Sequence, residues 1–186
     1  MYEGGKFSKS NNIGVFGNDC QQTGIRSDVW RYYLLSNRPE HFDNEFTWEG
    51  LAMRNNKDLL NSLGNMVNRV LKYTASKFGG KVPPLDPSYL TELETNLIKE
   101  LQNLVKEYCS CMENIEIKNA ASKLIEISHT LNKYLQDSEF WSKENLKKER
   151  NKLVIALMIR ILDFYGILIR PFLPESSEKL LQMLGE

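Results

Sequence analysis

Residues 55 to 78 constrain the fold of this chain most, because their apolar side chains recur with the period of an α-helix. At about 100° per residue they form one broad apolar face. Its members are Leu59, Leu63, Met66, Val67, Val70, Leu71, Thr74 and Phe78. Asn55 is the predicted N-cap, Asp58 suits the positive end of the helix dipole, and Gly79-Gly80 is the predicted stop. Gly64 predicts the close approach of another backbone. We expect this helix to form the first wall of a helical core.

The opposite face of this helix is rich in amide and cationic side chains. Its members are Asn61, Asn65, Asn68, Arg69, Lys72 and Ser76. Amides and guanidinium groups are the side-chain groups that hydrogen-bond base edges and phosphates, so the face is a candidate recognition surface. A solvated bundle face, or an asparagine that caps a neighbouring loop, is the alternative interpretation.

The rest of the chain predicts a bundle of helices behind an irregular N-terminal piece. Residues 1–26 read as a loop, which suggests that the chain is cut out of something larger. Ser27 and Asp28 are expected to cap a helix that ends before Pro39, with Trp30, Tyr32 and Tyr33 packing it on the bundle. Further helices are predicted at about 47–54, 90–111, 117–136, 145–169 and 174–185. The predicted fold is all-α, an antiparallel helix bundle, divided into segments 1–54 and 55–186.

Charge and cysteine usage narrow the possible partners. Lys+Arg and Asp+Glu both count 24, so any nucleic-acid binding must use a local basic patch and should weaken with salt. Such patches are predicted at 54–81 and at 143–152. Three cysteines make no disulfide framework, which suggests a reducing compartment and the cytoplasm. The most apolar run, 153–173, carries Arg160, Asp163 and Arg170, so we expect a core helix and no membrane partner.

The sequence Lys6-Phe7-Ser8-Lys9-Ser10 places two ammonium groups and two hydroxyls on a glycine-flanked loop. A mobile loop of this kind can close on a polyphosphate and neutralise charge that shifts in a transition state. A solvated tail is the alternative interpretation, and the P-loop pattern is absent from the sequence.

KFSKS resembles the KMSKS signature of class I aminoacyl-tRNA synthetases, and the flanking segments agree in order. They are YEGGKFSKSNNIGVFG, TGIRSDVWRYYLLSNRPE, FTW, NNKDLLNSLGNMVNR and FGGKVP. Together they resemble the methionyl-tRNA synthetases of the eukaryotic cytosol. Farther along, Asn132-Lys-Tyr134, Phe140-Trp141 and Pro171-Phe-Leu-Pro174 also agree. The resemblance implies a class Ia anticodon-binding bundle preceded by the signature loop and a stem-contact segment, where Arg31 lies.

The resemblance implies a methionine-tRNA ligase, which joins methionine to ATP, releases pyrophosphate and passes the methionyl group to tRNA. Lys9 would stabilise the leaving pyrophosphate with support from Lys6, and Lys6, Ser8, Lys9 and Ser10 would form the ATP-binding set. ATP with Mg would serve the full enzyme. The family's Rossmann domain, with its HIGH motif and methionine pocket, is missing from these residues. We therefore expect the isolated chain to be inactive in catalysis and to hold no cofactor.

The resemblance also assigns an anticodon site. Asn65 and Arg69 match the family's contacts to the CAU anticodon of tRNA(Met), and they lie one helical turn apart. Trp141, in the polar link 137–142, matches a tryptophan that stacks on the first anticodon base. A hydrophobic lid over the bundle end is the alternative role for Trp141. Asn61, Lys72 and Ser76 are expected to supply only the surrounding polar field.

Other residues carry weaker signals. Cys109 and Cys111 are spaced like two metal ligands, but no second pair completes a site, so we expect no metal. His41 and His129 lack the neighbours of a catalytic triad. We expect a monomer. Two other assignments stay open: an autonomous helical protein-interaction module, and the equivalent part of another class Ia synthetase, such as the leucine, isoleucine or cysteine enzyme.

Overall fold

Helices make up the regular structure of this protein in the computed structural model, which describes residues 1–40, 42–141 and 148–185. Those residues contain isolated β-bridges but no strand. The helices are α1 (Ser27–Ser36), α2 (Trp48–Arg54), a π-helix (Asn55–Gly64), α3 (Asn65–Phe78), α4 (Glu92–Glu113), α5 (Ile117–Asp137), α6 (Lys148–Ile169) and α7 (Pro174–Leu184), with 3-10 turns at Cys20–Thr23 and Pro87–Tyr89. The predicted all-α bundle is confirmed. His41 and the predicted helix start at Asn145 lie outside the described residues.

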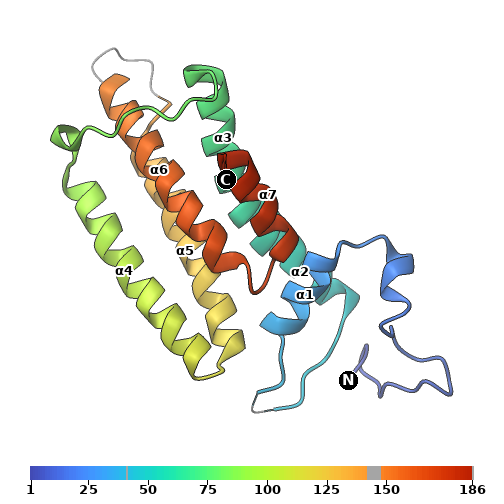
Figure 1. Ribbon diagram of the computed structural model, residues 1–186. Helices are drawn as coiled ribbons and strands as arrows, with labels where there is room; N and C mark the ends of the chain where they lie inside the picture. The colour runs from blue at the N-terminus through green and yellow to red at the C-terminus, as the bar shows by residue number, and fades with distance from the viewer. Residues whose placement is uncertain (41, 142–147, 186) are drawn as a thin grey trace.

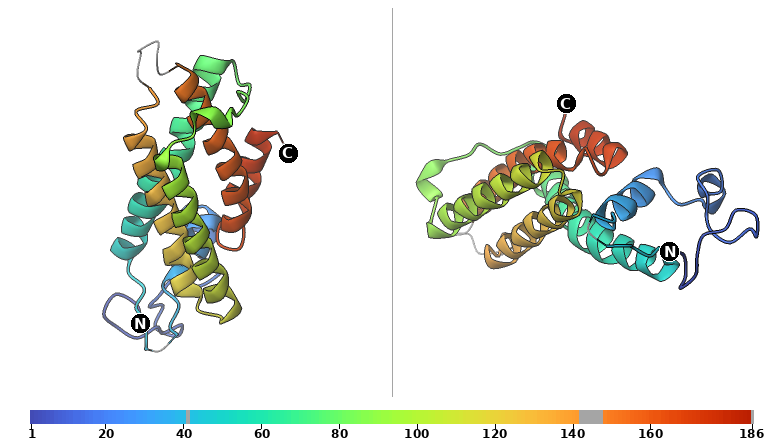
Figure 2. Two further views of the ribbon diagram at one scale, coloured as in Figure 1. Left: turned by 90° about the vertical axis from the view of Figure 1, so that its left-hand side faces the viewer. Right: turned by 90° about the horizontal axis from the view of Figure 1, so that it is seen from below.

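The long helices run antiparallel to their chain neighbours, and α1, α2 and the N-terminal segment gather at one end of the bundle (Figures 1 and 2). Helices α5 and α6 carry most of the core, and Leu131, Leu135, Met158 and Leu162 have no exposed surface. The run around α6 is therefore a core helix as predicted. No described helix is long and apolar enough to cross a membrane.

The long helix begins earlier than predicted. Arg54 and Asn55 both have right-handed helical dihedral angles, so the backbone is continuous from Trp48 to Phe78. The N-cap is Thr47, whose hydroxyl accepts the Gly50 N–H at 3.0 Å, and the prediction that Asn55 caps the helix is wrong. The division into 1–54 and 55–186 stays a prediction, and it falls within this continuous helix.

Asp58 is buried in mid-helix instead of facing a helix end. It accepts the Tyr32 hydroxyl at 2.9 Å and pairs with Arg54 at 3.1 Å. Burial raises the pKa of Tyr32, and the Asp58 charge raises it further, so the hydroxyl stays a donor at ordinary pH. These bonds satisfy a buried carboxylate and fix α1 on the long helix.

The π-helix is matched by polar groups on α5. In a π-helix the backbone hydrogen bonds join residues five apart instead of four. Within this segment, the Ser62 carbonyl also accepts the Asn132 side-chain amide at 2.9 Å. The Ser62 and Ser128 hydroxyls lie 2.8 Å apart in the same buried contact. A Cβ added at Gly64 would lie 3.1 Å from the Leu59 carbonyl oxygen. The missing side chain of Gly64 therefore leaves room for the backbone of its own helix. The prediction that it allows another backbone to approach closely is wrong.

Asp28 caps α7 and not its own helix. Its carboxylate accepts the backbone N–H groups of Glu175 at 3.2 Å and Ser176 at 2.7 Å, while Ser27 donates to the Glu175 carboxylate. Helix α1 has no side-chain cap. Helix α7 starts at Pro174 after Leu173, which has no capping group, so its free N–H groups need an acceptor from elsewhere. The predicted capping role of Ser27 and Asp28 is wrong for this reason.

The aromatic residues of α1 belong to two clusters. Tyr32 packs in the bundle core. Trp30 and Tyr33 join Phe46 and Leu51 in a second cluster beneath the N-terminal segment. The expectation that all three aromatic residues pack on the bundle therefore holds for Tyr32 alone.

Candidate functional site

The N-terminal segment is tied to the residues that precede α2. The Phe46 N–H donates to the Met1 carbonyl at 2.8 Å, and the Glu3 N–H donates to the Phe46 carbonyl at 3.0 Å. The Glu3 carboxylate then accepts the Trp48 N–H at 2.7 Å. The loop that carries Lys6 and Lys9 therefore projects from a fixed base.

The loop is a tight reversal with an apolar underside. Ser8 and Ile13 exchange both backbone hydrogen bonds at 2.9 Å. Lys6, Lys9 and Ser10 are exposed, and the half-buried Ser8 lies with its hydroxyl 3.3 Å from that of Ser10. Gly14 has φ +132°, and a Cβ there would lie 2.5 Å from the Phe7 ring. The arrangement presents two ammonium groups and two hydroxyls to solvent.

The polar face of the long helix faces solvent as predicted. Asn61, Asn65, Asn68, Lys72 and Ser76 are exposed and Arg69 is half-buried. Met66 and Val70, on the opposite face, are fully buried. The side chains of the candidate recognition surface are therefore accessible to a ligand.

Arg69 and Trp141, 72 positions apart in the sequence, are in contact. The Arg69 guanidinium carbon lies 5.5 Å from the Trp141 ring and 5.9 Å from the Phe140 ring, within cation–π range. Phe140 is 3% exposed, whereas Trp141 is 46% exposed. Phe140 thus belongs to the core, and Trp141 offers aromatic surface to a ligand.

A hollow of about 470 Å³ opens beside this pair. It is lined by Asn68, Arg69, Lys72, Tyr73, Ser76, Gln136, Phe140 and Trp141. Asn65 is not in the lining and lies one turn before Arg69 on the same exposed face. Sequence reasoning missed Tyr73 and Gln136. The four-residue step from Arg69 to Tyr73 was the signal that could have found Tyr73, whereas nothing in the sequence distinguishes Gln136.

A buried ion pair joins the start of α6 to α4 and α5. Arg150, at the start of α6, holds Glu94 of α4 with two bonds of 2.6 and 2.7 Å, and Tyr134 of α5 donates to the same carboxylate at 2.8 Å. Burial alone would raise the pKa of Glu94, but the bonds from Arg150, Thr91 and Tyr134 lower it to about 2. The carboxylate therefore stays ionised at neutral pH.

Ion pairs also reduce the net positive charge of the predicted basic patch at 143–152. Arg150 is engaged by Glu94, and Lys152 pairs with Glu149 at 2.6 Å. Lys143 and Lys147 lie outside the described residues. In the predicted patch at 54–81, Arg54 is likewise paired with Asp58. The cations of that patch that line the hollow are Arg69 and Lys72.

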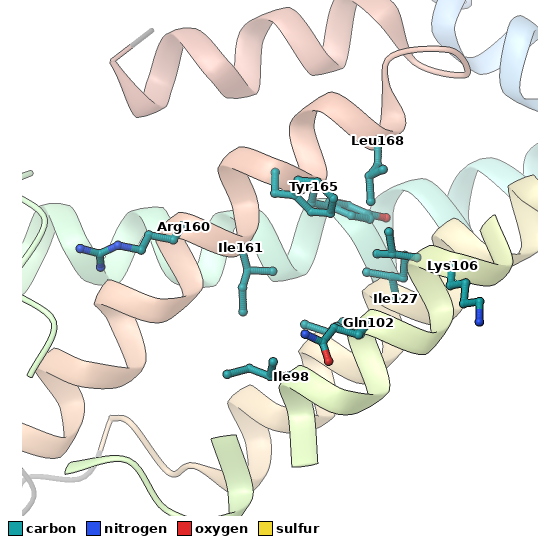
Figure 3. A pocket seen from close by; sticks show the side chains of 11 residues that line it. Ile98, Gln102, Lys106, Ile127, Arg160, Ile161, Tyr165 and Leu168 are labelled. Carbon is teal, nitrogen blue, oxygen red and sulfur yellow. The ribbon is translucent and has the colours of Figure 1, made fainter. Parts of the chain in front are cut away.

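A second hollow, of about 450 Å³, lies between α4 and α6 (Figure 3). Its lining is apolar except for Gln102, Lys106, Arg160 and the Tyr165 hydroxyl, which is bonded to the Leu124 carbonyl. Ile98 and Phe164 on its rim are more than a third exposed. This surface suits apolar groups of a ligand, not a nucleic-acid backbone.

The other residues that the sequence singled out, namely the cysteine pair, His129 and Arg31, lie outside the sites described above. Cys109 and Cys111 are free thiols on α4, and the described residues contain no group of three His, Cys, Asp or Glu side chains that could hold a metal. His129 is exposed. Arg31 donates to the Pro171 carbonyl at 2.8 Å and is exposed on α1.

Comparison with known families and proteins gives consistent matches. The family described as "tRNA synthetases class I (M)" matches residues 1–71. The family described as "Anticodon binding domain of methionyl tRNA ligase" matches residues 84–186. Together they cover the signature loop, the long helix as far as residue 71, and helices α4 to α7.

Individual relatives agree with these matches. The cytoplasmic methionine–tRNA ligase of Saccharomyces cerevisiae is 37% identical over 186 residues, which are 100% of this chain and 25% of the yeast protein. The Cereibacter sphaeroides methionine–tRNA ligase is 40% identical over 184 residues, which are 99% of this chain and 32% of that protein. The chain thus spans about a quarter to a third of these relatives.

A solved structure shows the same fold. Mycobacterium tuberculosis methionyl-tRNA synthetase in complex with methionyl-adenylate superposes with a TM-score of 0.86 at 22% identity. The match covers 96% of this chain and 36% of that one.

Proposed function

The chain belongs to the methionyl-tRNA ligase family, and on this premise we propose that it is the tRNA-reading part of such an enzyme. The predicted family is confirmed, and the leucine, isoleucine and cysteine enzymes are no longer needed as alternatives. The proposed partner is tRNA(Met), bound through its CAU anticodon. The observation that carries this proposal is the contact between Arg69 and the half-exposed Trp141, which both line the hollow.

The chemistry of the hollow suits an unstacked anticodon base. Stacking of a base on an exposed aromatic ring is worth roughly 1–3 kcal/mol, and Trp141 can supply that surface. Arg69 can donate to a base edge or a phosphate, and Asn68 and Lys72 extend the donor set along the helix. Asn65, one turn away, is proposed to contact the next nucleotide of the same loop.

The signature loop is proposed to serve the other end of the substrate. The N-terminal segment lies at the opposite end of the molecule from the C-terminal end of α3 (Figures 1 and 2), whose residues line the hollow. A tRNA likewise carries its anticodon and its aminoacylated 3′ end far apart. In the whole enzyme, with ATP and Mg, Lys9 would stabilise negative charge on the leaving pyrophosphate and Lys6 would support it. Ser8 and Ser10 would donate hydrogen bonds to phosphate oxygens.

We propose no catalysis by these residues alone, because methionine activation also needs groups that hold methionine and the adenine nucleotide. Methionine-dependent exchange between ATP and pyrophosphate by the purified 186-residue chain would contradict this. We further propose that the chain works in the cytoplasm, as the name of the yeast relative says of that protein, and that it binds tRNA as a monomer.

The test of anticodon recognition is the ratio of two dissociation constants. A hairpin that corresponds to an anticodon arm would be used in the CAU form and with its first anticodon base changed. We expect the change to weaken binding roughly fivefold or more, which is about 1 kcal/mol. Arg69→Ala and Asn65→Ala should reduce the preference for CAU. Equal affinity for both hairpins would contradict the proposal and leave only phosphate binding.

A second candidate function is an autonomous protein-interaction module. The apolar hollow between α4 and α6 (Figure 3) favours it, because its lining offers little to an RNA backbone. Two of its lining side chains, Ile98 and Phe164, are exposed. The same titration separates the two functions, since a module of this kind would not distinguish the two hairpins.

A further inference from the structure

Three chain segments meet at a partly buried contact between Tyr73 and Phe140, the residue that precedes Trp141. The Tyr73 hydroxyl on α3 donates to the Phe140 carbonyl at 3.0 Å, and the two rings are 4.8 Å apart. Burial raises the pKa of Tyr73, and a hydrogen bond from Asn151 on α6 offsets only part of that increase. The Tyr73 hydroxyl therefore connects α3, the segment after α5, and α6.

The two side chains of the anticodon site rest on this contact. Trp141 follows Phe140 in the chain, and their rings lie 5.2 Å apart at 78°. The Arg69 guanidinium carbon is 5.9 Å from the Phe140 ring. Glu139 has φ +46°, so the chain leaves the helical path just before Phe140. Helix α5 consequently does not fix the direction of Trp141, and the contacts of Phe140 do.

We propose that Tyr73 is a positioning residue for base recognition, holding Phe140 so that Trp141 and Arg69 are arranged before RNA binds. The inference rests on the proposed anticodon-binding function. If Trp141 and Arg69 already have their bound arrangement in the free protein, less side-chain entropy is lost when RNA binds. The Tyr73 hydroxyl carries no charge, so its removal should not alter the attraction of phosphates to Arg69 and Lys72.

The test is Tyr73→Phe in the full 186-residue chain, with Tyr89→Phe as the matched control. Tyr89 is 41% exposed and lies outside the hollow. Each variant would be titrated with the CAU hairpin and with the hairpin whose first anticodon base is changed, at several salt concentrations. Thermal unfolding would establish that both variants fold.

For Tyr73→Phe we expect the preference for CAU to fall at least roughly threefold, the loss that one partly buried hydrogen bond can cause. Affinity for the changed hairpin and the salt dependence should stay those of the unaltered chain, and Tyr89→Phe should match that chain throughout.

Two results would overturn the inference while leaving anticodon recognition intact. One is an unchanged preference in Tyr73→Phe. The other is an equal loss of affinity for both hairpins, which would make the hydroxyl a general support of the surface. If the unaltered chain itself shows no preference, the proposed function fails, and the inference fails with it.

Discussion

The buried pair between Glu94 and Arg150 makes a quantitative prediction about stability. Glu94 has no exposed surface and accepts hydrogen bonds from Arg150, Tyr134 and Thr91. The substitution Glu94→Gln keeps the size of the side chain and can still accept hydrogen bonds, but it removes the charge. The guanidinium of Arg150 then loses its ionic partner in a largely buried position.

The expected cost follows from the pKa of Glu94, which falls from 4.5 to about 2 on folding. A difference of about 2.5 units at 1.36 kcal/mol per unit corresponds to roughly 3 kcal/mol. Because the folded-state pKa is the lower one, this stability is present above pH 4.5 and is lost as the pH falls toward 2. At pH 3 somewhat less than half of it should remain.

The assay is urea denaturation followed by circular dichroism, at pH 7 and at pH 3, for the unaltered chain and for Glu94→Gln. Glu113→Gln, an exposed change on the same helix, is the control and should alter the free energy of unfolding by less than about 0.5 kcal/mol. We expect the difference between the unaltered chain and Glu94→Gln to shrink by about 2 kcal/mol between the two pH values. A difference that does not depend on pH would refute the reasoning.

Three further outcomes follow from other contacts. Asp28→Ala should lower the free energy of unfolding by about 1–2 kcal/mol in urea titrations, because α7 loses its acceptor, whereas a loss below about 0.3 kcal/mol would show that solvent replaces the cap. Asn132→Asp should lower it by about 1–3 kcal/mol at pH 7, because a carboxylate would face the Ser62 carbonyl in place of a donor, and no loss would contradict the assigned bond. Lys72→Ala should weaken both hairpins equally and reduce the slope of log affinity against log salt by about one, and a selective loss for CAU would instead make Lys72 a base-reading residue.

The helices were predictable because periodicity records which side of each segment is buried. The roles of Asp28 and Asp58 were not predictable, because capping rules consider only neighbours in the sequence. Asp28 satisfies a helix that begins at residue 174, and Asp58 is satisfied by Tyr32 from another helix. In both cases a tertiary contact decides the role of the carboxylate, and local sequence contains no trace of it.

The candidate site was predictable in part. Arg69 and Trp141 were named from the resemblance, and the fold brings them into contact. Tyr73 was not named because an aromatic residue beside an apolar face reads as core, and its significance depends on the Phe140 carbonyl, 67 positions away. Whether Asn65, Arg69 and Trp141 read the anticodon stays a prediction.

The most direct test of anticodon recognition is the emission of Trp141 during titration with the CAU hairpin. Trp30 and Trp48 also emit, so the signal of Trp141 is the difference between the unaltered chain and Trp141→Phe. We expect the CAU hairpin to quench this difference saturably, and the hairpin with the changed first anticodon base to quench it less. Tight binding of the CAU hairpin that leaves the Trp141 emission unaltered would contradict this expectation.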